Sequence, residues 1–230
     1  MRIVSWNCNG RFRDKIENIL SYNADLYVIQ ESENPYKYIQ QFKNKIKTYY
    51  WFGLNNNKGL LVFSNSKIKV SNNNWENYGL RHFISLKIND SFDLIGVWAS
   101  PPYIEEYYIY QQINKSKYNN STIIIGDFNS NSIWDKEHKE RNHSAVVQQL
   151  EEFGLFSAYH TFYQEKQGKE TQSTFYLHRN MDKGYHIDFC FVDPKRLKNF
   201  EIGNKSRWLN YSDHMPIIVD IVNTQDYQSF

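Results

Sequence analysis

Residues 121–131, STIIIGDFNSN, contain the clearest strand in the chain, and this strand stops at a group of polar residues. Four of the first five residues are β-branched, which predicts a buried strand. Side chains two positions apart on a strand point to the same face, so we expect Asp127 and Asn129 to reach one site. The alternative is a local turn in which the Asp127 side chain accepts a hydrogen bond from the backbone that follows it.

Segments typical of strands alternate with segments typical of helices on both sides of this stretch. Further strands are expected at residues 2–7, 25–30, 59–64, 82–88, 92–98, 173–176, 187–192 and 216–222. Helices are expected at residues 14–20, 105–116 and 143–153, and Gly154 is suited to end the last of them. No repeat or linker divides the sequence. The pattern predicts one α/β domain over residues 1–230.

Composition narrows the class of protein. The 17% aromatic content favours a packed protein over a disordered one. The net charge of +2 permits a polyanionic partner without requiring one. No apolar run is long enough for a signal peptide or a membrane span, so we expect a soluble, cytoplasmic protein that acts as a monomer. Cys8 and Cys190 lie far apart in apolar surroundings, which suits free buried thiols and offers no cysteine cluster for zinc.

Further polar residues lie at or near the ends of other predicted strands. Asn7 and Glu31 are at the ends of the first two, Asp188 stands among the apolar residues of 187–192, and Asp213 and His214 come just before the last strand. Each has an ordinary explanation: Asn7 as a turn former, Glu31 as the start of a solvated loop, His214 as a hydrogen-bonded histidine. A carboxylate amid apolar neighbours, as at Asp188, needs a partner if it is buried. Because ligands usually bind at strand ends in α/β sheets, the set together indicates a single site.

The order of these segments resembles the endonuclease/exonuclease/phosphatase family, in particular exonuclease III and pancreatic-type deoxyribonucleases. The matching segments are VSWNCNG (4–10), ADLYVIQES (24–32), KGLLVFS (58–64), IIIGDFNS (123–130), STFY (173–176), HIDFCFV (186–192) and SDHMPI (212–217). The resemblance implies a four-layer α/β sandwich, with two mixed β-sheets packed face to face and helices outside. It also implies a hydrolase that acts on phosphoester bonds with Mg²⁺ or Mn²⁺.

The resemblance assigns a role to each residue of the set. Glu31 would be the main metal ligand, with Asn7 beside the metal and the phosphate and Asp213 as a candidate ligand for a second metal. Asp127 would position or deprotonate water, or protonate the leaving group. Asn129 would bind the phosphate or orient Asp127. His214 would bind a non-bridging oxygen as imidazolium, and Asp188 would hold its ring.

One position departs from the family pattern. Trp98 stands where the deoxyribonucleases have a histidine that contacts the phosphate, and Tyr103 follows out of register. Trp98 is equally compatible with a core or rim residue. The identity of one phosphate ligand is therefore open.

Three functions remain possible. The first is a nuclease acting on DNA or RNA, for which Phe175 and Tyr176 could stack on a sugar or base while His178 and Arg179 meet the backbone. The two aromatic residues could equally be ordinary strand residues. The second is a phosphatase or phosphodiesterase for a small molecule or lipid head group, although the Trp-Cys-Asp-Arg string of the 5-phosphatases is replaced here by Tyr-His-Ile-Asp (185–188). The third is a binding module without activity, which the complete set of polar residues disfavours.

Overall fold

The apolar runs of the chain form two six-stranded β-sheets in this computed structural model, which describes residues 1–222. The first sheet has the order β13-β14-β1-β2-β4-β3, with strands at Leu197–Ile202, Ile217–Ile221, Arg2–Asn7, Leu26–Ser32, Lys58–Ser64 and Thr48–Asn55. The second has the order β5-β6-β7-β8-β12-β9, with strands at Val70–Asn72, Phe83–Ile88, Phe92–Trp98, Thr122–Asp127, Asp188–Val192 and Phe156–Ser157. A short hairpin joins β10 (Phe175–Tyr176) to β11 (Gly184–Tyr185).

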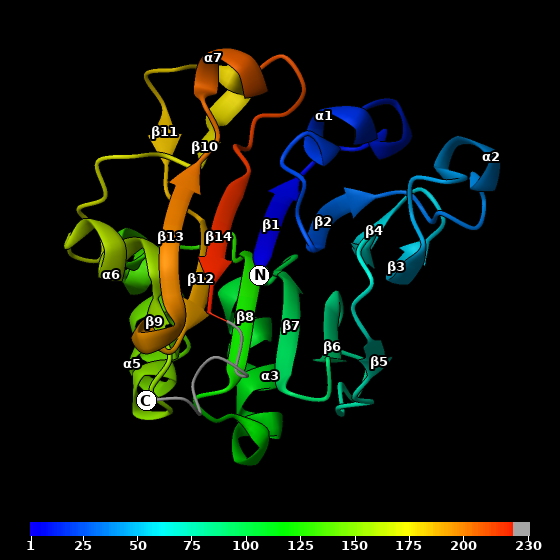
Figure 1. The fold of residues 1–230 in the computed structure, drawn as a ribbon. Helices are drawn as coiled ribbons and strands as arrows, with labels where there is room; N and C mark the ends of the chain where they lie inside the picture. Colours follow the sequence, from blue (N-terminus) through cyan, green and yellow to red (C-terminus); the bar gives the residue numbers. More distant parts are fainter. Residues whose placement is uncertain (223–230) are drawn as a thin grey trace.

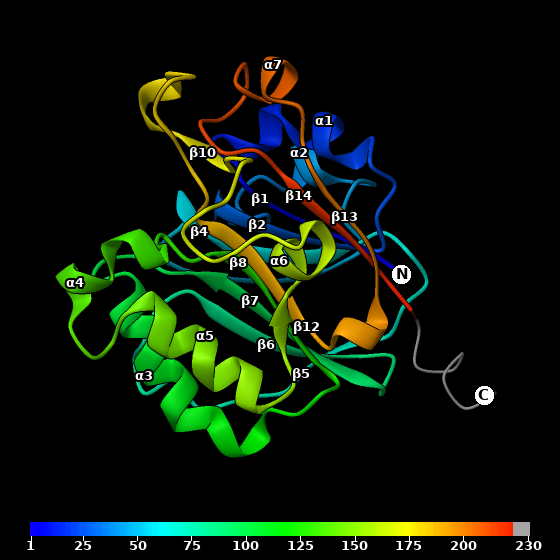
Figure 2. The same ribbon diagram turned by 90° about the vertical axis from the view of Figure 1, so that its left-hand side faces the viewer.

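Helices cover the outer faces of both sheets (Figures 1 and 2). The α-helices are α1 (Ile16–Leu20), α2 (Ile39–Phe42), α3 (Ile104–Asn114), α4 (Asp135–His138), α5 (His143–Glu152), α6 (Ala158–Tyr163) and α7 (Lys205–Trp208). Of these, α6 packs at one edge against β12 and β13. Short 3₁₀ turns are η1 (Phe12–Asp14), η2 (Lys115–Lys117), η3 (Ser132–Trp134), η4 (Leu177–Arg179) and η5 (Pro194–Arg196). None of the helices in residues 1–222 is long and apolar enough to cross a membrane.

Three hydrophobic clusters hold the layers together. The central cluster joins the inner faces of the sheets, with Val28 and Val62 from the first and Leu94 and Ile125 from the second. A second cluster packs α1 and α7 on the first sheet, and a third packs α3 and α5 on the second. The result is helices, sheet, sheet and helices in succession, which is the predicted four-layer sandwich.

Each sheet contains one parallel pair of strands, and in both sheets this pair is away from the edges. β1 runs parallel to β2, with Asn7 opposite Gln30, and β7 runs parallel to β8, with Trp98 opposite Asp127. The remaining pairs are antiparallel, so both sheets are mixed, as predicted. Parallel strands end at the same edge of a sheet. This topology therefore brings the polar ends of β1, β2, β7 and β8 to one end of the sandwich.

Five strands were not predicted: β3, β5, β9, β11 and β13. Four of them are the edges of the two six-stranded sheets, and β5, β9 and β11 have only two or three residues each. β3 and β13 carry partly exposed residues on both faces, so neither shows the strict alternation of a half-buried strand. Residues 173–176 were predicted as a strand, but only Phe175–Tyr176 is one. The predicted single domain includes residues 223–230, which lie outside the described residues, and it stays a prediction.

Candidate active site

Asp127 ends β8 and is fully buried, with three hydrogen bonds to its carboxylate. Asn7 Nδ2 and Asn129 Nδ2 each donate to Oδ2 at 2.9 Å, and the Asn129 backbone N–H donates to Oδ1 at 2.8 Å. Charged acceptors with several donors are held in one orientation. The carboxylate is thus fixed between the two sheets.

Asp127 and Asn129 meet as predicted, but not as alternate residues on one face of a strand. The strand ends at Asp127, and Asn129 lies beyond it with a left-handed φ of 47°. Asn129 therefore curls back towards Asp127. Its backbone N–H makes the predicted alternative, the local turn, while its side chain reaches the same carboxylate.

Gly126 makes the close approach of β8 to β7 possible just before Asp127. Its φ is 155°, and a Cβ atom at this position would lie 1.9 Å from the carbonyl oxygen of Val97. Only glycine fits there without moving the backbone. The residue before Asp127 thus sets the position of the carboxylate through backbone geometry.

Asp188 and His214 form a buried hydrogen-bonded pair. Asp188 begins β12 directly opposite Asp127, and its Oδ2 lies 3.0 Å from His214 Nδ1. The other ring nitrogen, Nε2, lies 4.0 Å from Asp127 Oδ2. His214 is also held by its backbone. Its carbonyl accepts a hydrogen bond from Trp6 Nε1 at 3.0 Å, and its N–H donates one to Ser212 Oγ at 3.0 Å.

The two aspartates change the charge state of the imidazole. Burial alone would lower the pKa of His214, but the negative charges of Asp188 and Asp127 outweigh it and raise this pKa to about 9. Burial raises the pKa of Asp127, and the charge of Asp188 adds to that effect, while His214 opposes it. At neutral pH the site therefore holds an imidazolium beside a carboxyl group that can exchange a proton.

Glu31 lies in an irregular part of β2. The pairing of β2 with β4 shifts register between Ile29 and Ser32, and Glu31 has a φ of 61°. Bulges of this kind redirect a side chain next to an active site. The carboxylate is paired with Lys58, whose Nζ lies 2.7 Å from Oε2. Glu31 was predicted to follow the strand, but β2 continues to Ser32.

Asp213 stands apart from this group. Its Oδ1 accepts a hydrogen bond from Asn9 Nδ2 at 2.9 Å in an exposed contact. The structure thus pairs it with an amide and not with Glu31 or Asp127. Its role as a ligand for a second metal stays a prediction.

The residues present fit a hard divalent cation. Glu31 and Asn7 offer carboxylate and amide oxygens, the donors that Mg²⁺ and Mn²⁺ prefer. The Lys58 ammonium, paired with Glu31, places a positive charge at the carboxylate where a cation would bind. Ligand atoms of Asp127, Asp188 and His214 also lie within 4.8 Å of one another. However, the positive charge of His214 in this second group would repel a cation, so Glu31 is the better candidate for a metal ligand.

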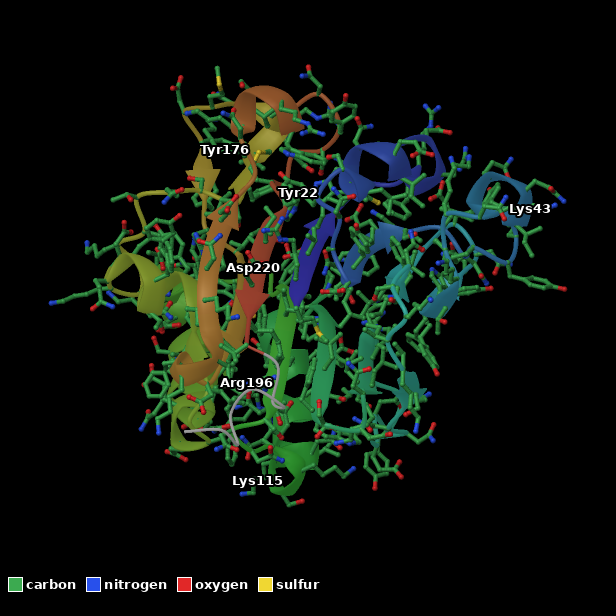
Figure 3. The ribbon with its side chains drawn as sticks, viewed as in Figure 1. Tyr22, Lys43, Lys115, Tyr176, Arg196 and Asp220 are labelled. Carbon is green, nitrogen blue, oxygen red and sulfur yellow. The ribbon has the colours of Figure 1, made fainter. Side chains whose placement is uncertain are left out.

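Phe175 and Tyr176 face different surroundings, although they are neighbours in β10. The Phe175 ring lies 4.7 Å from the His214 ring between centroids, so it borders the site. Tyr176 is 7% exposed and packs in the cluster beneath the first sheet, at the end of the molecule that carries β10 and α7 (Figure 3). This burial agrees with the alternative of an ordinary strand residue, and the stacking of Tyr176 on a substrate stays a prediction.

His178 and Arg179 are exposed in η4, beyond β10, and both have positive φ values. Burial lowers the pKa of Lys15, and the charge of Arg179 lowers it further. The charge of Arg179 is thus felt at Lys15, but no contact joins His178 or Arg179 to Asp127 in the described residues. Their contact with a nucleic-acid backbone stays a prediction.

Three neighbours of the site were not predicted. Lys58 pairs with Glu31, Thr174 Oγ1 accepts from the Asp188 N–H at 3.0 Å, and the His82 ring lies 4.3 Å from the Trp98 ring between centroids. Trp98 itself is 8% exposed and belongs to the central cluster, as its core alternative predicted. A lysine in KGLLVFS and a threonine in STFY carry no signal that separates them from ordinary strand residues.

Solved structures with the same fold include an endonuclease and a phosphatase. An AP endonuclease from Archaeoglobus fulgidus has a TM-score of 0.70 and 19% identity, covering 97% of this chain and 100% of that chain. A variant of the 3′ phosphatase NExo from Neisseria, bound to a product DNA hairpin, has a TM-score of 0.68 and 19% identity with the same coverage. At this identity the likeness shows the fold. No curated protein matches the sequence.

A sequence profile shows the family directly. The profile described as Endonuclease/Exonuclease/phosphatase family matches residues 4–214, which include Asn7, Glu31, Asp127, Asp188 and His214. The match covers nearly the whole chain, and the sandwich and the buried aspartate–histidine group agree with it. The chain belongs to the endonuclease/exonuclease/phosphatase family, whose members hydrolyse phosphoester bonds.

Proposed function

We propose that the protein is a nuclease that hydrolyses phosphodiester bonds of DNA with the help of Mg²⁺ or Mn²⁺. The observation that carries the proposal is the buried group formed by Asp127, Asp188 and His214, held by Asn7 and Asn129. Phosphodiester hydrolysis needs an oriented water, a proton donor or acceptor and positive charge on the phosphate oxygens. Asp127 on β8 can transfer a proton, and His214, held by Asp188 on the adjoining strand β12, can supply positive charge.

His214 and Asp188 act together on the phosphate. Because Asp188 holds Nδ1, the ring presents Nε2 towards Asp127 and the phosphate that would lie beside it. The raised pKa keeps the ring positive, so Nε2–H donates to a non-bridging oxygen as charge builds up on it.

Asp127 moves the proton. Its carboxylate is oriented by Asn7 and Asn129, and burial raises its pKa towards the range in which a carboxyl group both takes and gives protons. It either removes a proton from the attacking water or gives one to the leaving oxygen. A divalent cation on Glu31, with Asn7 beside it, would supply positive charge to the phosphate oxygens when bound.

DNA is favoured as the substrate by two observations. Among the similar structures, the Neisseria protein is bound to a product DNA hairpin and the Archaeoglobus protein is described as an AP endonuclease. The exposed basic residues His178 and Arg179 also follow closely after Phe175, whose ring borders His214, and they suit a phosphate backbone.

A second candidate is phosphatase activity, because the Neisseria structure of the same fold is described as a 3′ phosphatase. A small phosphorylated molecule or a lipid head group remains an alternative substrate of that kind. An inactive nucleic-acid-binding module is disfavoured because the carboxylates, amides and histidine of the set are assembled in hydrogen-bonding geometry.

A substrate panel tests the proposal. It contains supercoiled plasmid, single-stranded DNA, a duplex with an abasic site, a 3′-phosphorylated oligonucleotide, RNA and inositol phosphates, each with Mg²⁺ or Mn²⁺. We expect cleavage of DNA that weakens steeply as salt rises, since phosphate contacts release counterions. Hydrolysis of an inositol phosphate without a cut in any nucleic acid would replace the proposal with the small-molecule phosphatase.

A further inference from the structure

Four side chains form a row across the second sheet at its active-site end. Asp188 lies opposite Asp127, Asp127 lies opposite Trp98, and the Trp98 N–H donates to the His82 carbonyl at 3.1 Å. Residues directly opposite on neighbouring strands share a face of the sheet. Since strands are about 4.8 Å apart, His82 lies about 10 Å from Asp127 in the same row.

His82 is held firmly in this row. Its φ is 62°, a left-handed conformation that few residues other than glycine adopt, and its ring packs on the Trp98 ring at 4.3 Å between centroids. The Phe52 ring from the facing sheet meets it edge-on at 6.0 Å. A strained backbone kept in place by surrounding contacts points to a functional position.

Only one nitrogen of the His82 ring is engaged. Nδ1 lies 3.1 Å from Ser100 Oγ, and burial lowers the pKa of the ring to about 4, so the ring is neutral. The Ser100 hydroxyl can donate to Nδ1, and in that tautomer the ring proton is on Nε2. Nε2 has no protein partner among residues 1–222 and is not one of the buried unpaired polar atoms, so this N–H reaches solvent.

The surroundings of this N–H suit a nucleotide. Lys58, from the facing sheet, has its Nζ 5.8 Å from the centroid of the Trp98 ring. Phe52 is 36% exposed. A cation, a neutral N–H donor and an exposed aromatic face are the groups that bind the phosphate and the sugar or base of a nucleic-acid strand. They lie at the end of the row away from His214.

We propose that His82 is a substrate-binding residue that donates a hydrogen bond from Nε2 to the phosphate of the nucleotide next to the bond being cut. The Phe52 ring lies beside the sugar or base of that nucleotide. The inference rests on the proposed nuclease function and adds a direction to it: the substrate strand extends from Asp127 across Trp98 towards β3 and β6.

The test compares a long and a short substrate. His82→Asn keeps a residue that tolerates positive φ but is too short to place a donor at the Nε2 position. His138→Asn, on α4 where His138 contacts Glu105, is the matched control. The substrates are the DNA oligonucleotide that is cleaved best and bis(4-nitrophenyl) phosphate, which has no neighbouring nucleotide.

We expect His82→Asn to raise KM for the oligonucleotide about tenfold or more, because a hydrogen bond to a charged group is lost. Its kcat on the oligonucleotide and its kcat/KM on the small substrate should change by less than about twofold. A neutral methylphosphonate at the neighbouring phosphate should harm the wild type and hardly harm the variant, since the two changes remove the same contact.

Equal losses on both substrates, no loss on either, or multiplicative losses with the methylphosphonate would overturn the assignment of His82 while leaving the nuclease intact. A wild type that hydrolyses bis(4-nitrophenyl) phosphate but no nucleic acid would overturn the proposed function, and this inference with it. If thermal unfolding shows that His82→Asn does not fold, Phe52→Leu decides instead. It should raise KM for the oligonucleotide only, and an unchanged KM would refute the subsite.

Discussion

Asp188 Oδ2 and His214 Nδ1 lie 3.0 Å apart in the buried centre of the site, and this contact turns the other ring nitrogen of His214 towards Asp127. The aspartate does two things for the histidine. It fixes which nitrogen faces the substrate, and it stabilises the positive charge of the ring. The pair is therefore expected to behave as one functional unit.

Asp188→Asn should reduce kcat/KM by roughly 10²-fold to 10⁴-fold, because the amide keeps the shape but loses the charge that orients and protonates the ring. His214→Ala should be about as slow, and the double variant little slower than either. The measurement is kcat/KM for all four proteins on the best substrate of the panel. Losses that multiply in the double variant would show that the two residues act independently.

The activity should fall on the alkaline side as His214 loses its proton, with an apparent pKa of about 9. The charged form of the ring donates to the phosphate, so the activity is present below this pKa and is lost as the pH rises above it. Asp188→Asn removes a negative charge that favours the cation, and the midpoint should move to lower pH. An unchanged midpoint in the pH profile of kcat/KM would contradict this electrostatic role.

Glu31→Gln should weaken the binding of Mg²⁺ by about tenfold or more, because a charged oxygen ligand becomes neutral. The Kd for Mg²⁺ is measured by calorimetry, independently of activity. Glu17→Gln is the control, since Glu17 forms a similar but exposed pair with Lys45 at 2.8 Å. Equal Mg²⁺ affinity in wild type and Glu31→Gln would remove Glu31 from the metal site.

Phe175 and Tyr176 are neighbours in the chain but should respond differently to substitution. Tyr176→Ala should destabilise the fold by about 3 kcal/mol, because a buried ring leaves a cavity in the first sheet's outer cluster. Phe175→Ala should lower kcat/KM with a smaller loss of stability, since this ring borders His214. Urea unfolding and steady-state kinetics separate the two. A large loss of activity with full stability for Tyr176→Ala would support the prediction of stacking.

Acid should destabilise the protein between about pH 6.5 and about pH 4. Burial lowers the pKa of both His143 and His186 to about 4, so the unfolded chain binds more protons than the folded one in this range. Stability then rises with pH through the window and falls as pH drops, by about 3 kcal/mol for each histidine. His186→Gln should flatten part of this slope in urea titrations, and a slope equal to that of wild type would argue against it.

Much of the site was predictable because its residues follow strands whose apolar patterns are strong. Asn7, Asp127 and Asp188 stand at the ends of buried runs, and the family segments place Glu31 and His214. The edge strands β3 and β13 were missed because partial exposure on both faces blurs the alternation. The strands β5, β9 and β11 were missed because two or three residues are too few to show a pattern.

Other features depend on long-range packing that no local pattern reports. Two of them depend on backbone conformation: the bulge at Glu31 and the left-handed turn that brings Asn129 back to Asp127. A third, the packing of His82 on Trp98, joins the residue before β6 to the last residue of β7. The burial of Tyr176 could not be predicted for the same reason, since an aromatic residue next to a site looks the same in sequence whether it faces the substrate or the core.

The most direct measurement is cleavage of a 5′-labelled DNA oligonucleotide by wild type and Asp127→Asn, with Mg²⁺ and with EDTA, after thermal unfolding has shown that both proteins fold. We predict that the wild type cuts with Mg²⁺, stops in EDTA and recovers when Mg²⁺ is restored. Asp127→Asn should be slower by about 10³-fold or more, because the buried carboxylate that exchanges the proton is gone. Undiminished cleavage in EDTA, or by folded Asp127→Asn, would contradict the account.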